Sequence, residues 1–101
     1  MIIVLVTFPI SSELDAASLK DKFLETAPIY REAPGLLRKN YISDVEKHRA
    51  GGVYCFDTME NAKNWFDEKR IEWITQRYSK PDLQFFENPV LVDNDKGQII
   101  S

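Results

Sequence analysis

Residues 36–57 read LLRKNYISDVEKHRAGGVYCFD, and this stretch decides how the chain folds. Apolar and aromatic residues recur in residues 36–44 and again in residues 51–57, which predicts a strand in each segment. The segment VEKHRAGG between them is polar and ends in two glycines. Two strands joined by a short polar loop are typical of an antiparallel hairpin. In the second of these strands, alternation puts Val53 and Cys55 on one face and Tyr54 and Phe56 on the other.

A strand and a helix are expected before this hairpin. Residues 1–10, MIIVLVTFPI, are rich in β-branched residues and apolar on both faces, which predicts a central strand covered on both sides. Residues 11–35 predict a helix capped by Ser11 or Ser12, in which Pro28 kinks or ends the last turn. The apolar residues at helical spacing are Ala16, Leu19, Phe23, Ala27 and Tyr30.

A second helix and a fourth strand are expected after the hairpin. Residues 58–82 predict a helical region that Thr58 or Asp57 caps and that breaks or bends near Lys69. Residues 82–93, DLQFFENPVLVD, predict a strand in which a proline indicates an edge position or a bend. The remaining residues, NDKGQIIS, predict a polar tail that is frayed or held by a partner.

The element order is therefore β-α-β-β-α-β over one domain, residues 1–101. This order is typical of a ferredoxin-like α+β fold, a four-stranded antiparallel sheet with helices on one face. Helices on one face leave the other face of the apolar first strand uncovered. A second copy of the chain would cover that face, so we expect a homodimer.

Charge and composition exclude several classes of partner. The chain has 101 residues, a net charge of −3 and an isoelectric point near 5.1. This acidic balance argues against nucleic-acid binding and against docking on an anionic membrane. The apolar N-terminal run lacks the marks of a signal peptide, and no run is long enough to span a bilayer. One cysteine is compatible with a reducing compartment, so we expect a cytoplasmic protein.

The hairpin holds the only histidine, the only cysteine and a glycine pair, but it predicts no catalytic dyad. His48 lies in the turn and Cys55 in an extended strand, so the two side chains should be ~20 Å apart. Gly51 and Gly52 lead into a strand, whereas phosphate-binding glycine loops open a helix. They indicate a turn or bulge with positive φ, or a close backbone approach. One histidine and no repeat of ligands predict no metal site.

Aromatic residues from helices and strands can converge between the two layers. Most of them are expected to form the core, but buried Trp and Tyr need polar partners, which Arg38, Asn40 and Arg77 could supply. An aromatic-lined pocket with a few polar groups is typical of a small-molecule site. The aromatic residues in question are Tyr30, Tyr41, Tyr54, Phe56, Trp65, Trp73, Tyr78, Phe85 and Phe86.

Residues 33–69 resemble the YdhR-like family of monooxygenases. The similar motifs are a Pro-Gly turn at residues 34–36 that leads into a strand, the hairpin EKHRAGGVYCF at residues 46–56, and the helix around Ala62. The element order matches the family over nearly the whole chain. The resemblance implies a dimeric α+β barrel, in which two ferredoxin-like subunits join their sheets.

The resemblance also implies a cofactor-independent monooxygenase acting on a small aromatic or polycyclic substrate. The wider superfamily includes heme-degrading enzymes, isomerases and decarboxylases. The heme-degrading branch uses an Asn on the first strand and a His in the second helical region. In this chain residues 1–10 contain no Asn and residues 59–80 contain no His. We therefore expect no cofactor. A non-catalytic ligand-binding or stress-response module and an isomerase or lyase remain alternative hypotheses.

The family comparison and the aromatic clustering together give the candidate site residues. Asn40, Tyr41, Trp65, Trp73 and Tyr30 are the predicted substrate-binding residues. His48 and Arg77 are the candidate catalytic residues, because either could stabilise negative charge.

Overall fold

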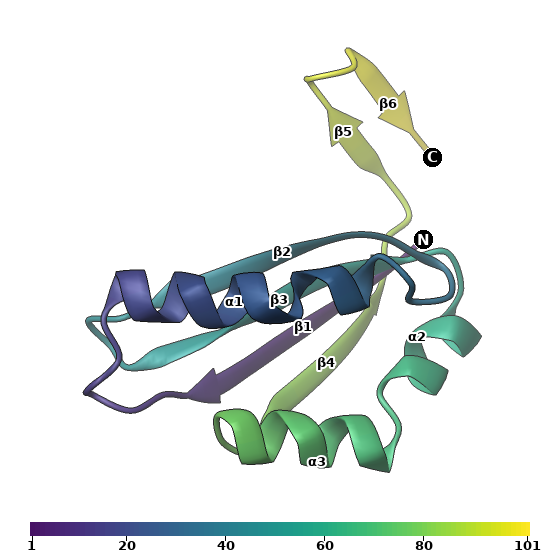
Figure 1. The fold of residues 1–101 in the computed structure, drawn as a ribbon. Helices are drawn as coiled ribbons and strands as arrows, with labels where there is room; N and C mark the ends of the chain where they lie inside the picture. The colour runs from purple at the N-terminus through teal and green to yellow at the C-terminus, as the bar shows by residue number, and fades with distance from the viewer.

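A computed structural model describes residues 1–101, and Figure 1 shows how the elements are arranged. Six strands and three helices follow one another in an order that contains the predicted β-α-β-β-α-β plan. Their bounds are β1 (Ile2–Pro9), α1 (Ala16–Tyr30), β2 (Leu36–Asp44), β3 (Arg49–Phe56), α2 (Met59–Trp65), α3 (Glu68–Arg77), β4 (Asp82–Glu87), β5 (Leu91–Asp93) and β6 (Gln98–Ile100).

The main sheet is antiparallel throughout and has the strand order β2-β3-β1-β4. The helices α1, α2 and α3 lie on one side of this sheet (Figure 1). The predicted ferredoxin-like α+β fold is thus confirmed. None of the three helices has both the length and the apolar character that a bilayer crossing requires.

The central strand β1 alternates between the two faces of the sheet. Val4 and Val6 are fully buried against the helices, and Ile2 and Phe8 lie on the same face. The intervening side chains point to the opposite face and remain partly exposed. We call that opposite face the open sheet face; its apolar residues include Ile3, Leu5, Val53 and Phe86.

The β2–β3 hairpin is confirmed, with a shorter loop than predicted. Strand β3 begins at Arg49, so Gly51 and Gly52 lie inside the strand and not in a turn or bulge. Neither glycine has a positive φ; within the hairpin that conformation is found at His48, with φ at 55°. Of the predicted reasons for the glycines, close backbone approach is correct, because a β-carbon on Gly51 would collide with the carbonyl oxygen of Val6.

Helix α1 begins later than predicted. Its N-cap is Asp15, whose carboxylate accepts a 2.8 Å hydrogen bond from the backbone N–H of Ser18, so neither predicted serine caps the helix. Pro28 lies inside the helix, which continues to Tyr30. Tyr30 is buried, and this packing holds the last turn despite the hydrogen bond that a proline cannot donate.

The second helical region is two helices. Thr58 caps α2, accepting a 3.1 Å hydrogen bond from Asn61 N–H, as one of the two predicted caps. The predicted break lies at Phe66–Asp67, earlier than Lys69, because Asp67 caps α3 by accepting from Arg70 N–H at 2.8 Å. The break lets the two helices follow different directions over the sheet (Figure 1).

The C-terminal residues differ most from the prediction. Strand β4 ends at Glu87, and Leu91–Asp93 leaves the sheet to pair with Gln98–Ile100 in a separate hairpin. Pro89 lies between the two and ends pairing with β1, because proline has no N–H to donate. The hairpin β5–β6 projects from the body of the molecule (Figure 1). The residues predicted to be a polar tail thus include a strand.

Candidate functional site

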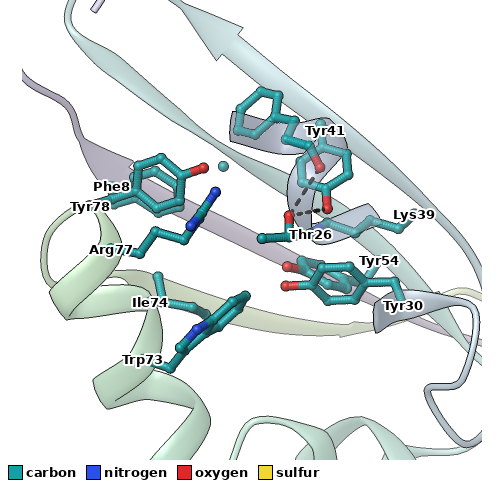
Figure 2. A pocket seen from close by; sticks show the side chains of 12 residues that line it. Phe8, Thr26, Tyr30, Lys39, Tyr41, Tyr54, Trp73, Ile74, Arg77 and Tyr78 are labelled. Carbon is teal, nitrogen blue, oxygen red and sulfur yellow. Dashed lines mark hydrogen bonds between the residues drawn. The ribbon is translucent and has the colours of Figure 1, made fainter. Parts of the chain in front are cut away.

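A small cavity lies between the helix-covered face of the sheet and helices α1 and α3 (Figure 2). We call it the inner cavity. Its volume is about 20 Å³, which is room for about one water molecule. It is lined by Phe8, Phe23, Thr26, Tyr30, Lys39, Tyr41, Gly51, Tyr54, Trp73, Ile74, Arg77 and Tyr78.

Lys39 is the residue around which the aromatic side chains are arranged. Its amino nitrogen lies 3.4 Å from the ring centre of Tyr30, 3.6 Å from that of Tyr41 and 4.6 Å from that of Tyr54. The rings come from α1, β2 and β3, and Lys39 is the cross-strand partner of Tyr54. Three elements thus hold one amine against three aromatic faces, as Figure 2 shows.

The protonation of Lys39 is set by this enclosure. Burial lowers the pKa of Lys39 from 10.5 to about 6, and the nearby Arg70 guanidinium adds to the effect. Aromatic faces attract a cation, so the three rings oppose part of this shift. No carboxylate forms an ion pair with Lys39, since the two ion pairs of the chain are Arg49–Asp44 and Arg77–Glu25.

The tyrosines around Lys39 stay protonated at neutral pH. Burial raises the pKa of Tyr41 to about 12 and raises those of Tyr30 and Tyr54 above their ordinary value. The hydroxyls of Tyr41 and Thr26 are 2.8 Å apart, and Thr26 donates to the carbonyl of Phe23 at 3.1 Å. Because a hydroxyl has one proton, Tyr41 is the donor to Thr26. The tyrosines are therefore donors and not bases.

Arg77 supplies a cation on the opposite wall. Its guanidinium donates to the carbonyl of Lys22 and to the carboxylate of Glu25, each at 2.8 Å. The hydrogen bond that Arg77 donates to the Glu25 carboxylate raises the pKa of Arg77 further above its ordinary value. The Nε atom of Arg77 and the hydroxyl of Tyr78 are buried without a hydrogen-bond partner. Both residues line the cavity.

A larger hollow adjoins the inner cavity. We call it the outer hollow; its volume is about 340 Å³, in the range of small-molecule sites. Tyr30, Lys39 and Tyr41 line both spaces, so Lys39 lies where they meet. The outer hollow is lined by Ala27, Tyr30, Arg31, Leu36, Leu37, Arg38, Lys39 and Tyr41.

The structure brings four of the seven predicted residues together. Tyr30, Tyr41, Trp73 and Arg77 all line the inner cavity. Trp65 lies beside it, with its ring centre 5.6 Å from that of Tyr30, but does not line it. The indole N–H of Trp65 is buried without a partner.

Asn40 and His48 lie outside the site. Asn40 is exposed and pairs with Val53 on the open sheet face, because it follows the inward-facing Lys39 by one residue. His48 is exposed in the β2–β3 turn and lines neither space. Alternation along β2 and the position of the turn therefore remove both from the candidate site.

Lys39 and Thr26 are the polar residues of the inner cavity that the sequence prediction missed. A single signal could have found Lys39, namely that it shares a strand face with Tyr41 and is cross-strand from Tyr54. Thr26 carries no comparable signal, because a threonine between apolar helix positions is common on exposed surfaces. The structure instead buries it to 5% exposure.

The geometry suits an aromatic ligand that carries or acquires negative charge. Rings form the walls, with Phe8 stacked on Tyr78 at 4.6 Å between centres and Phe23 stacked on Tyr41 at 4.5 Å. The Lys39 amine, the Arg77 guanidinium and several protonated hydroxyls face the space, and no carboxylate lines it. No group of three His, Cys, Asp or Glu side chains could hold a metal ion.

Solved structures with the same fold include enzymes and ligand complexes. MhuD, with two manganese protoporphyrin IX molecules bound per active site, is 15% identical over 92% of this chain and 99% of its own, with a TM-score of 0.69. SnoaB, a cofactor-independent oxygenase from Streptomyces nogalater, is 12% identical over 86% and 91%, with a TM-score of 0.62. The ActVA-Orf6 monooxygenase of Streptomyces coelicolor, in complex with nanaomycin D, is 18% identical over 86% of each chain, with a TM-score of 0.60.

These identities are too low to show more than a shared fold. No curated protein matches the chain. One family model does match, the model described as "Putative mono-oxygenase ydhR", and it covers residues 3–86. This range includes the whole four-stranded sheet apart from its first and last residues, and all three helices. The chain therefore belongs to the ydhR mono-oxygenase family.

Proposed function

We propose that this protein is a cofactor-independent monooxygenase that acts on a small aromatic or polycyclic substrate between the sheet and the helices. The observation that carries the proposal is the aromatic-walled inner cavity, which Lys39 and Arg77 line and no carboxylate does. Two proteins with this fold support the proposal. One is a cofactor-independent oxygenase, and the other is a monooxygenase in complex with nanaomycin D.

The reaction needs no external reductant. A ring CH₂ next to a carbonyl loses a proton, and the resulting carbanion reduces molecular oxygen. One oxygen atom becomes a new carbonyl of the substrate and the other leaves as water, so CH₂ and O₂ give C=O and H₂O. The protein would exclude water and stabilise the anion with Lys39, Arg77 and the hydroxyl donors.

The inner cavity is smaller than any aromatic ring, so a substrate must bind elsewhere first. The outer hollow has the required volume and shares Tyr30, Lys39 and Tyr41 with the inner cavity. Trp73 is only partly buried and forms part of the inner wall. A ring bound in the outer hollow would enter the inner cavity as these side chains change rotamer.

We also propose that the working form is a cytoplasmic homodimer joined through the open sheet face. Ile3, Leu5 and Val53 are partly exposed there, and Phe86 is 50% exposed. A contiguous apolar sheet face requires a cover, and a second copy supplies one. Light scattering at micromolar concentration is expected to give twice the chain mass. A strictly monomeric species would contradict the proposal.

Oxygen uptake with anthrone tests the proposed reaction. The metal-free protein, with a chelator present, is expected to consume oxygen above the blank and to form anthraquinone in an equal amount. Replacing Trp73, which lines the inner cavity, by Ala is expected to lower the rate by at least about tenfold, equivalent to about 1.4 kcal/mol. Lys20→Met, on the exposed side of α1, is the matched control and keeps the rate.

A non-catalytic ligand-binding module is the second candidate function. The observation that favours it is the lack of any lining His, Asp or Glu, the usual acid–base residues. Such a module would show saturable thermal shifts with anthrone and no product. An isomerase or lyase would instead consume its substrate without taking up oxygen.

A further inference from the structure

We propose that Lys39 is the base of this site and that its substrates are aromatic compounds with an acidic hydroxyl or enol, whose proton the amine accepts. The proposal deepens the monooxygenase function and rests on it. Lys39 touches both the inner cavity and the outer hollow, so it meets a ligand in either space.

Elimination among the lining residues leaves Lys39 as the base. Neither space is lined by a His, Asp or Glu. The lining tyrosines keep their protons, and Arg77 is held charged by Glu25. Burial favours the uncharged form of Lys39, and an uncharged amine has the free electron pair that a base requires.

The groups around Lys39 make its two protonation states close in free energy. The rings of Tyr30 of α1, Tyr41 of its own strand and Tyr54 of β3 face it, and the Arg70 guanidinium of α3 repels its charge. Arg70 and burial disfavour the ammonium, whereas the three ring faces favour it. No anion of the protein neutralises the ammonium, so a ligand oxyanion would be its first counter-ion.

The outer hollow supports the same substrate class. Arg31 and Arg38 line it together with Lys39, and no acidic residue does. Leu36, Leu37 and Ala27 give the hollow an apolar surface for a ring. An aromatic ring would contact the apolar residues of this surface, and an ionisable hydroxyl on the ring would contact its basic residues.

The step is a single proton transfer. The substrate O–H bond breaks and its electron pair stays on oxygen, while the electron pair of the Lys39 nitrogen forms a new N–H bond. The products are an ammonium and an aromatic oxyanion held side by side. No oxidant is involved, so the step can be examined without oxygen.

Binding of para-cyanophenol under nitrogen tests the proposal. At neutral pH the free phenol is largely uncharged, and ultraviolet absorption distinguishes it from its phenolate. Wild-type protein is expected to bind the phenolate without releasing a proton, as measured by calorimetry in buffers of different ionisation enthalpy. Benzonitrile, which has no hydroxyl, is expected to bind at least about tenfold more weakly.

Two variants distinguish a Lys39 side chain that accepts the ligand's proton from one that acts only as a permanent positive charge. Lys39→Arg is expected to bind the phenolate but to release about one proton per ligand, because arginine is already protonated. Lys39→Met is expected to bind the neutral phenol, at least about tenfold more weakly. Lys20→Met is expected to behave as wild type. Thermal unfolding checks that each variant is folded, and Lys39→Gln replaces Lys39→Met if the latter is not.

Three results would overturn the proposal: a neutral phenol bound to wild type, one proton released by wild type, or phenolate bound to Lys39→Met with wild-type affinity. The result is independent of turnover. Phenolate binding with no oxygen uptake from anthrone would leave Lys39 as the base and reject the oxygenase. Oxygen uptake from anthrone by wild type, together with any of the three binding results above, would reject Lys39 as the base and keep the oxygenase.

Discussion

The amino nitrogen of Lys39 lies 3.4 Å from the centre of the Tyr30 ring, although the two residues belong to different layers of the fold. Tyr30 is the last residue of α1 and is 8% exposed, while Lys39 lies on β2. The contact therefore joins the end of the first helix to the sheet at the place where the two binding spaces meet. Predictions about the site and about stability both follow from it.

Replacing Lys39 by Met should change how stability depends on pH. Because the folded-state pKa of Lys39 is lowered from 10.5 to about 6, the unfolded state binds more protons between these values, and stability rises with pH. The destabilising effect of Lys39 is complete below about pH 6 and fades as pH rises toward 10.5. Lys39→Met should thus gain most over wild type at low pH, by at most about 1.4 kcal/mol per pH unit.

Urea unfolding of both proteins across this pH range measures the difference. Lys20→Met is the control and should track wild type at every pH. A difference between Lys39→Met and wild type that stays constant with pH would mean that the ring faces keep Lys39 charged and that the lowered pKa is wrong.

The hydrogen bond between Tyr41 and Thr26 should couple β2 to α1 energetically. Tyr41→Phe keeps the ring stacked on Phe23 and removes only the hydroxyl, so it should destabilise the protein by about 1 kcal/mol. Thr26→Val should cost a similar amount. A double-mutant cycle by urea unfolding should give a coupling of about 1 kcal/mol, and strictly additive effects would show that the bond does not contribute.

The adjacent glycines of β3 should differ in their tolerance of a methyl group. A β-carbon on Gly51 would collide with the carbonyl oxygen of Val6, which belongs to the neighbouring strand and cannot move alone. On Gly52 it would meet the ends of the Lys39 and Tyr54 side chains at 3.0 Å, and these can shift. Gly51→Ala should cost about 2 kcal/mol or more and Gly52→Ala less. Equal losses in thermal unfolding would contradict this account.

A charge on the open sheet face should weaken the proposed dimer. Phe86 is 50% exposed there, whereas Leu24 is 59% exposed on α1, away from the sheet. Phe86→Lys should raise the dimer dissociation constant by at least about tenfold, because the interface would bury an unpaired ammonium. Leu24→Lys should leave it unchanged. Sedimentation measures the dimer dissociation constant of each variant. A weaker dimer in Leu24→Lys than in Phe86→Lys would place the interface on the helices.

Sequence patterns predict the main sheet and part of the helix capping well, because these features depend on residues that are close together in the sequence. The hairpin, the central strand and the Thr58 cap each depend on a few neighbouring residues. The Asp15 cap was missed because two serines nearby offer the same chemistry. Pro89 was interpreted as a sign of an edge position or a bend within one strand. Strand β4 does lie at the edge of the sheet, but the C-terminal residues were mispredicted because Pro89 separates two sheets.

The candidate site was only partly predictable, because the sheet face on which a residue lies and how deeply it is buried matter more there than its type. Tyr30, Tyr41 and Trp73 were identified as aromatic residues that need polar partners. Asn40 was chosen for its amide, but strand alternation places its neighbour Lys39 in the site instead. A lysine in a strand usually indicates an exposed position, so residue type alone gives no reason to place it among three rings.

Anaerobic preincubation of the metal-free protein with anthrone, followed by a known amount of oxygen, tests the central claim most directly. The account predicts that wild type consumes oxygen and forms anthraquinone in a one-to-one ratio, and that Trp73→Ala does so at least about tenfold more slowly. Oxygen uptake and anthraquinone formation equal to those of the protein-free blank would contradict it.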